Sequence, residues 1–277
     1  MLALAGPACA QTAAIEMRIG VAYGPFPVEQ GDLFIPAEPK GRKPAIVMIH
    51  GGGWIGGSRS GDTDLARSIA SKGVVVFNVD YRLAVPSQPE TRWPAQLLDA
   101  QLAVRFLRAH AEALGVDPAR IGAMGDSAGA QLAVFLGVLP RSVPGDVAGL
   151  YSDQRPDVAA VVDQFGPMDL PAMGASAAGS ISALFGPVPP SGAALLTASP
   201  LPSIGSRSAP IYIIHGERDE IVPFEQSRQL ADTVRVREGA SELVAYKGGH
   251  EYQGVAPEEV ARLQAAAVTW LVGRLRR

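Results

Sequence analysis

Short apolar runs recur along the chain, and segments with helical periodicity separate them. From about residue 45 onward, runs such as "AIVMIHG", "VVVFNVDYR" and "IYIIHG" are mostly continuous stretches of apolar residues, without regular alternation of apolar and polar residues. A continuous run is typical of a strand that is covered on both faces, as in a parallel sheet. Strands that alternate with helices in this order predict a doubly wound α/β fold.

About eight strands are expected, most of them parallel, with helices on both faces of the sheet. No internal repeat and no charged linker divides the sequence, and 47% of its 277 residues are apolar, so residues 11–277 are expected to form one domain. The expected helices span about 62–72, 94–114, 127–138, 225–237 and 257–275. The expected strands are "MRIGVAYG", "DLFIP", "AIVMIHG", "VVVFNVDYR", "RIGAMGD", "VAAVVDQFG", "IYIIHG" and "ELVAYKG".

The charge pattern narrows the possible partners. The formal net charge is −3 and the sequence contains no long basic run, so a nucleic-acid partner is not expected. No apolar run reaches the roughly 18 residues of a membrane span. A small-molecule substrate is the expected partner, and the oligomeric state is left open.

The first residues, "MLALAGPACAQTAA", are apolar and end in small side chains. Ala8 and Ala10 have the A-x-A spacing of a signal-peptidase site, which predicts a partial signal peptide over residues 1–10 and an exported, periplasmic or secreted protein. The alternative is a disordered apolar N-terminus. Cys9 is the only cysteine, so cleavage after Ala10 would leave no thiol for a disulfide or a metal site.

The stretch "GDSAG" places Ser127 between two glycines, directly after a short apolar run. A strand that turns at once into a helix bends too sharply for side chains at Gly125 and Gly129. Such a turn would hold the Ser127 hydroxyl at a helix N-terminus, where developing negative charge is stabilised. Ser127 is therefore the candidate nucleophile, and the alternative is an ordinary glycine-rich turn.

A serine nucleophile needs a base, and the sequence offers four histidines. His110 lies near a helix end and is expected to be exposed. His50 and His215 end strands and precede glycines, so they are interpreted as residues that fix loops by hydrogen bonds. His250 follows the last strand on a two-glycine loop, "YKGGHEY", which favours it as the base.

The base needs a carboxylate to orient it. The loop "HGERDEIVP" offers Glu217, Asp219 and Glu220 beyond the end of a strand. Asp219 is preferred because Ser127, Asp219 and His250 then follow the nucleophile, acid and base order of α/β-hydrolases. Asp169, in "FGPMDL", is the reserve candidate. The buried helical acid Asp99 is instead interpreted as structural, with Arg82 or Arg120 as its partner.

The stretch "HGGGW" can supply donors for an oxyanion. Gly52 and Gly53 have no side chains to block their N–H groups, and the Ala128 N–H follows the nucleophile. The alternative is a phosphate loop, but position 57 is glycine where that motif needs lysine. No cofactor or metal is therefore expected. Trp54 follows these glycines and is expected to wall a small acyl pocket, or else only to pack the loop.

Together, "HGGGW", "DYRLA", "GDSAG", "HGERDEIVP" and "GGH" resemble an α/β-hydrolase serine esterase. The resemblance is to the bacterial and fungal feruloyl and acetyl esterases, with kinship to hormone-sensitive-lipase-like esterases, and extends from about residue 30 to the end. It implies Ser127 as nucleophile, Asp219 as acid and His250 as base, with oxyanion donors at Gly52, Gly53 and Ala128. The region 171–205, where such esterases vary their lid, is short and poor in aromatic residues, so sugar-stacking surfaces are not evident.

The sequence therefore predicts a serine carboxylesterase that cleaves short-acyl esters, acetyl or butyryl, on a carbohydrate or aryl alcohol. Two alternatives remain at this point. An amidase such as an arylformamidase or a small peptidase would use the same three residues. A hydrolase-fold binding protein would be expected to lack one of them, and none is missing here.

Overall fold

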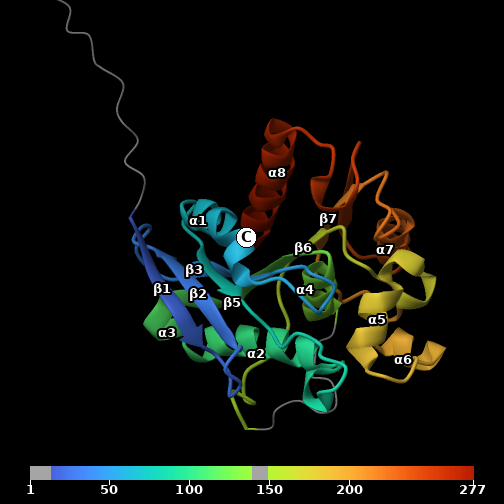
Figure 1. Cartoon of the computed structure of the whole chain (residues 1–277). Helices are drawn as coiled ribbons and strands as arrows, with labels where there is room; N and C mark the ends of the chain where they lie inside the picture. Colours follow the sequence, from blue (N-terminus) through green and yellow to red (C-terminus); the bar gives the residue numbers. More distant parts are fainter. Residues whose placement is uncertain (1–13, 139–148) are drawn as a thin grey trace, which may run out of the picture.

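An eight-stranded sheet forms the centre of the fold (Figure 1). The computed structural model describes residues 14–138 and 149–277. The strands lie in the order β1-β2-β4-β3-β5-β6-β7-β8, with β2 antiparallel to both of its neighbours and the pairs from β4 to β8 parallel. This confirms the predicted mostly parallel sheet of the α/β-hydrolase fold.

The strands match the apolar runs of the sequence, because these runs are the segments that both faces of the sheet bury. All residues of β3, β4, β6 and β7 are buried. The strands are β1 (Ile15–Ala22), β2 (Gln30–Pro36), β3 (Lys43–Ile49), β4 (Val75–Val79), β5 (Val116–Asp126), β6 (Val161–Gln164), β7 (Ile211–Gly216) and β8 (Ser241–Tyr246).

The helices lie on both faces of the sheet, as predicted. One apolar cluster packs α2, α4 and α7 against one face, and a second packs α1 and α8 against the other. The helices are α1 (Thr63–Ala70), α2 (Ala95–Ala109), α3 (Ala111–Leu114), α4 (Ala128–Val138), α5 (Ala178–Phe185), α6 (Gly192–Thr197), α7 (Glu225–Val236) and α8 (Pro257–Leu275).

The expected helix 94–114 is two helices, so this prediction is wrong in its continuity. The backbone leaves the helical conformation at His110 (φ −103°, ψ 16°), between α2 and α3. The His110 imidazole is half-buried, not exposed, because it packs on the Phe106 ring with 4.3 Å between centroids. Gly115 then ends α3 in the left-handed conformation (φ 63°), which glycine adopts without strain.

The predicted signal peptide over residues 1–10, with Cys9, lies outside the described residues. Among the helices that the structure describes, none combines the length and the apolar character needed to cross a bilayer.

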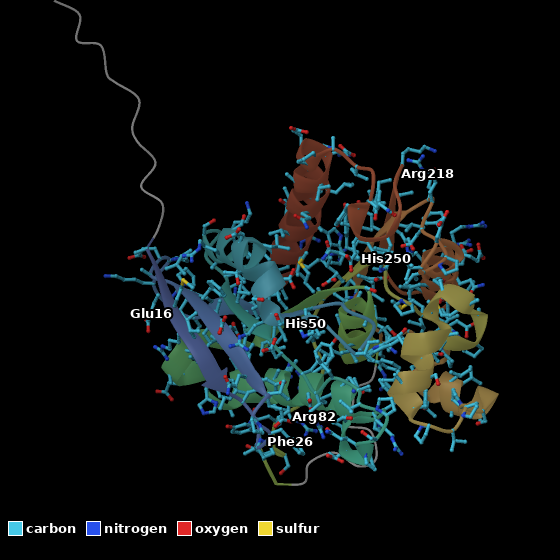
Figure 2. All side chains as sticks on the ribbon, viewed as in Figure 1. Glu16, Phe26, His50, Arg82, Arg218 and His250 are labelled. Atoms are coloured by element: carbon cyan, nitrogen blue, oxygen red, sulfur yellow. The ribbon has the colours of Figure 1, made fainter. Side chains whose placement is uncertain are left out.

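Asp99, on α2, forms a buried ion pair with Arg82, which is one of the two partners that the sequence predicted. The Arg82 Nε donates to Asp99 Oδ1 at 2.9 Å, and the guanidinium also lies over the Phe26 ring at 4.3 Å (Figure 2). Arg120 pairs instead with Asp117. Asp99 is fully buried, so this pair is structural, in agreement with the sequence interpretation.

Glu29 is a second buried acid beside this pair. Burial, and then the charge of Asp99, raise the pKa of Glu29 to about 8. The folded chain therefore holds a proton that the unfolded chain releases above about pH 4.5. Stability should fall as pH rises from about 4.5 to about 8, because in this window the unfolded state binds fewer protons than the folded state.

Replacing Glu29 with the uncharged glutamine (Glu29→Gln) should remove this loss of stability at higher pH. The free energy of unfolding at pH 8 should rise by roughly 2–4 kcal/mol relative to the parent, while the two proteins should differ little at pH 4. Urea denaturation at several pH values measures this effect. Glu16→Gln, at an exposed glutamate, is the control and should keep the parental pH dependence. An unchanged slope in Glu29→Gln would show that Glu29 is ionised in the folded protein.

Candidate active site

Ser127 lies at the tight turn between β5 and α4, which we call the nucleophile turn (residues 125–129). Its backbone is left-handed (φ 49°), a conformation that a residue with a side chain adopts only under strain. A side chain at Gly125 would meet the Gly129 backbone at 2.4 Å, and one at Gly129 would meet the Ile49 carbonyl oxygen at 2.0 Å. Both glycines are therefore required by the close approach of the backbone, as the sequence predicted.

His250 lies on the histidine loop (residues 247–253), which follows β8 (Figure 2). Its Nε2 is 2.9 Å from the Ser127 Oγ, and its Nδ1 is 2.6 Å from Asp219 Oδ2. Ser127, Asp219 and His250 come from the ends of three different strands, yet they form one continuous hydrogen-bonded chain. The structure thus brings together the three residues that the sequence singled out.

Asp219 is held as a carboxylate by its surroundings. Its Oδ1 accepts hydrogen bonds from the backbone N–H groups of Ile221 and Val222, at 2.9 and 2.8 Å. Burial favours the neutral acid, but hydrogen bonds from His215, His250 and the Val222 N–H outweigh it and lower the pKa of Asp219 well below its usual value. Asp219 can therefore stabilise a positive charge on His250. Asp169, the reserve candidate, does not take part in this hydrogen-bonded chain in the described part of the protein; its backbone bonds to the Gln226 side chain instead.

His215 has a contact that the sequence did not reveal. The imidazole is fully buried, with Nδ1 2.6 Å from the Ser227 Oγ and Nε2 2.9 Å from the Val222 carbonyl oxygen, so it fixes the loop after β7 as predicted. The same Nε2 is also 3.2 Å from Asp219 Oδ2. His215 and His250 therefore contact the same carboxylate oxygen of Asp219, and both help to orient it.

His50 also fixes a loop, as predicted. The Nδ1 is 2.7 Å from the Gly51 carbonyl oxygen, and the ring stacks on Tyr81 at 4.4 Å between centroids. Burial lowers the pKa of His50, so the imidazole is neutral and donates this bond. The Tyr81 hydroxyl in turn donates to the His50 carbonyl oxygen at 3.1 Å. These contacts fix the start of the loop of residues 51–57, which we call the glycine loop.

The glycine loop presents backbone donors. Gly52 and Gly53 have positive φ angles of 106° and 59°, and a side chain at Gly52 would meet the Gly56 carbonyl oxygen at 2.2 Å. Among residues 14–138 and 149–277, the N–H groups of Gly52, Gly53 and Ala128 have no hydrogen-bond acceptor. Ala128 is the first residue of α4, whose N-terminal N–H groups have no partner within the helix.

Trp54 is buried, with only 2% of its surface exposed, so the structure favours the interpretation that its indole packs the loop. Its Nε1 donates to the Gln131 side chain at 3.0 Å, and the ring belongs to an apolar cluster with Ala128 and Leu184. This packing role is the alternative that the sequence left open beside a pocket wall. Any effect of Trp54 on substrate is therefore exerted through packing.

The lid region 171–205 carries two helices that the sequence did not predict, α5 and α6. Residues of α5 pack on the glycine loop: a side chain at Gly53 would meet the Ser180 Cβ at 3.1 Å. The Gln131 side chain, the one polar group in the otherwise apolar α4, donates to the Ala198 carbonyl oxygen at 2.6 Å and so ties the lid to the nucleophile helix. A single polar residue in an otherwise apolar helix was the signal in the sequence that another segment packs on α4 at this point.

An open, acidic pocket of about 370 Å³ adjoins the other side of the glycine loop. Gly52, Asp62, Asp126 and Glu251 line it. Burial, and then the charges of the neighbouring carboxylates Asp62 and Glu251, together raise the pKa of Asp126 to about 8. Asp126 also accepts a hydrogen bond from the Gly51 N–H at 3.0 Å, so it helps to hold the glycine loop against the nucleophile turn.

Known proteins resemble this chain in sequence and in fold. The BD-FAE family model matches residues 32–234, which is well over half of the chain. Esterase LipC of Mycobacterium tuberculosis is 30% identical over 230 residues, which cover 79% of this chain and 55% of LipC. The chain spans about half the length of the curated relatives it matches.

Solved structures match over nearly the whole chain. A truncated carbohydrate esterase from gut microbiota is 25% identical with a TM-score of 0.80, and the match covers 97% of this chain and 99% of that one. Thermogutta terrifontis esterase 2, phosphorylated by paraoxon, is 26% identical with a TM-score of 0.72, and the match covers 95% of each chain. The chain therefore belongs to the BD-FAE family and has the α/β-hydrolase fold of the esterases that it resembles.

Proposed function

We propose that the protein is a serine carboxylesterase that hydrolyses short-acyl esters through an acyl-enzyme. The observation that carries this proposal is the hydrogen-bonded chain Ser127–His250–Asp219, with distances of 2.9 and 2.6 Å. The backbone N–H groups of Gly52, Gly53 and Ala128, which have no acceptor among the described residues, support it. The esterases among the relatives support the same chemistry.

In the proposed mechanism, His250 accepts the Ser127 proton through Nε2 while the Oγ attacks the ester carbonyl carbon. The carbonyl oxygen becomes an oxyanion that the N–H groups of Gly52, Gly53 and Ala128 stabilise. The intermediate collapses as His250 returns the proton to the leaving alcohol, and the acyl group stays on Ser127. Water then attacks the acyl-enzyme while His250 accepts its proton, and the carboxylic acid leaves as His250 returns the proton to the Ser127 Oγ. Asp219 keeps Nδ1 protonated and stabilises the imidazolium.

A substrate panel tests this proposal and its nearest rival. We expect hydrolysis of p-nitrophenyl acetate and butyrate, with slower turnover of a matched acetanilide or formanilide, because the amide is the more stable acyl compound. A feruloyl ester in the same panel reports whether an aryl acyl group fits. Turnover of the formanilide at a higher kcat/KM than the acetate would instead identify an amidase. Hydrolysis of none of these compounds by the folded protein would favour a binding protein.

The acyl chain should be short, because buried side chains fill the space next to Ala128. The cluster of Trp54, Ile181 and Leu184 with Ala128 leaves these residues at most 8% exposed. We expect acetyl and butyryl esters to have a kcat/KM at least about 10-fold above that of the octanoyl ester, since a long chain would have to displace packed side chains. A series of p-nitrophenyl esters from two to twelve carbons measures this.

Trp54→Ala should shift this chain-length profile toward longer acyl groups, because it empties volume in the same cluster. It should also lower the free energy of unfolding by roughly 3–5 kcal/mol, as deletion of a buried aromatic ring does. Trp270→Ala, on the half-buried face of α8, is the control and should keep the parental profile. Equal rates from acetyl to dodecanoyl in the parent would show that no short acyl pocket exists.

We also propose that the protein is exported, on the basis of the apolar segment with Ala8 and Ala10. Expression of the full sequence in a bacterial host, followed by N-terminal sequencing of the periplasmic and medium fractions, should give a chain that begins at Gln11. Recovery of the uncleaved chain from the cytoplasmic fraction alone would contradict export by this segment.

A further inference from the structure

The two loops that carry Ser127 and His250 meet at Gln164, the last residue of β6. Its backbone carbonyl oxygen accepts the Ser127 N–H at 2.8 Å. Its side-chain Oε1 accepts the hydroxyl of Tyr252 at 2.6 Å. Tyr252 lies only two residues after His250. One buried residue thus makes hydrogen bonds to both the nucleophile turn and the histidine loop.

The histidine loop needs such a restraint, because its backbone is strained where it leaves His250. Glu251 and Tyr252 both have left-handed conformations (φ 50° and 61°), which residues with side chains adopt only when the surroundings enforce them. The loop also contains two glycines, Gly248 and Gly249, directly before the histidine. A loop of this composition does not hold an imidazole in place by its own conformational preferences.

Aromatic packing completes the restraint. Phe165, the residue after Gln164, packs edge-to-face against His250 at 5.1 Å and against Tyr252 at 5.3 Å. The Tyr252 ring stacks on Tyr246 at 5.0 Å. The Tyr252 backbone N–H also donates to the Tyr246 hydroxyl at 3.2 Å. The hydrogen bond to Gln164 is the directional contact that holds the end of the Tyr252 side chain and links it to the nucleophile turn.

We propose that Gln164 and Tyr252 are positioning residues that hold His250 within hydrogen-bond distance of Ser127. Among the described residues, the Ser127 Oγ and the imidazole nitrogens bond to each other and to Asp219, not to Gln164 or Tyr252. Both positioning residues therefore act through the backbone of the two loops. The inference rests on the proposed function, since the position of His250 matters for turnover only if it is the base. Small displacements of such a base are costly, because proton transfer needs close and aligned partners.

Tyr252→Phe tests the proposal, because it removes the hydroxyl and keeps the ring contacts. We expect kcat to fall about 10-fold or more with KM changed less than about 2-fold, and labelling of Ser127 by a fluorophosphonate to slow by the same factor. Tyr23→Phe is the matched control: its buried hydroxyl donates to the Asp80 carbonyl oxygen at 2.5 Å, away from the histidine loop. Tyr23→Phe should keep the parental kcat, although it should lose about as much thermal stability as Tyr252→Phe.

A double-mutant cycle tests whether the two residues act through one bond. Gln164→Met removes the acceptor but keeps the backbone carbonyl that binds the Ser127 N–H. The double variant Tyr252→Phe/Gln164→Met should lose no more kcat than Tyr252→Phe alone. Losses that multiply, or parental kcat and labelling rate in Tyr252→Phe, would overturn the proposal.

A crystal structure of Tyr252→Phe separates this inference from the proposed function. We expect the His250 Nε2 to Ser127 Oγ distance to lengthen beyond hydrogen-bond range, whatever the protein's substrate. An unchanged distance of 2.9 Å would refute the positioning role even in an active esterase. An inactive parental protein with a displaced imidazole in the variant would instead refute the esterase function and leave the positioning role intact.

Discussion

Ser127→Ala should lower ester hydrolysis by about 10⁶-fold in kcat, because the covalent route through an acyl-enzyme is lost. The residual rate should still exceed that of water, since the oxyanion donors and the binding surface remain. Ser127 is 7% exposed and loss of its hydroxyl leaves only a small space, so the thermal midpoint should change little. Steady-state kinetics with p-nitrophenyl acetate, together with thermal unfolding, measure both quantities.

Ser180→Ala is the matched control, at a serine that lies close to the glycine loop. Its Oγ donates to the Ala177 carbonyl oxygen at 3.0 Å, and it makes no bond to His250. It should keep kcat within about 3-fold of the parent, as surface substitutions away from the reacting atoms usually do. A Ser127→Ala protein that retained more than one hundredth of the parental kcat would contradict a nucleophilic role for Ser127.

His250→Ala should be nearly as severe, because Ser127 then has no group to accept its proton. We expect a loss of roughly 10⁵ to 10⁶-fold in kcat. His215→Ala is the comparison that decides which histidine is the base, since both imidazoles contact Asp219. His215 Nε2 is 3.2 Å from Asp219 Oδ2, whereas the imidazole that bonds to the Ser127 Oγ is that of His250. Loss of His215 should therefore act by loosening Asp219 and should cost far less, about 10-fold to 100-fold.

Measuring kcat for His250→Ala and His215→Ala side by side shows which histidine is the base. His215 is fully buried, so His215→Gln, which can still bond to Ser227, should accompany His215→Ala to separate activity from folding. A folded His215→Gln protein with abolished turnover, next to an active His250→Ala protein, would reverse the assignment of the base.

The sheet could be predicted from the sequence because buried parallel strands have a simple signature. The run "IYIIHG" matches β7 residue for residue, and the last expected helix, 257–275, has the bounds of α8. Pro257 at the first helical position and the acids Glu258 and Glu259 in the first turn mark the start of α8. These local signals do not depend on tertiary contacts.

The lid and the burial of Trp54 could not be predicted in the same way. The sequences of α5 and α6, "AGSISALF" and "GAALLT", contain small residues and no charged face that would mark a helix. They fold against Trp54, Ala128 and Leu170, so their structure depends on contacts between distant segments. The expectation that Trp54 walls a small acyl pocket stays a prediction, which the chain-length profile of Trp54→Ala tests.

The candidate site was predictable for a different reason. Ser127, Asp219 and His250 each follow a recognisable strand, and parallel strands bring their carboxyl ends to one edge of the sheet. The supporting contacts were hidden, because nothing in the sequence shows that Gln164 faces Tyr252 or that His215 reaches Asp219. Those contacts depend on the register of β6 and on the path of two loops.

Fluorophosphonate labelling of the purified protein, followed by peptide mapping, tests the central claim most directly. A phosphonylated serine reports a hydroxyl that a neighbouring base has activated, whatever the natural ester is. We expect one phosphonyl group per chain, on Ser127, with labelling abolished in Ser127→Ala and strongly slowed in His250→Ala. An unlabelled Ser127 in the folded parental protein, or an adduct on another residue, would contradict the assignment of Ser127 as the nucleophile.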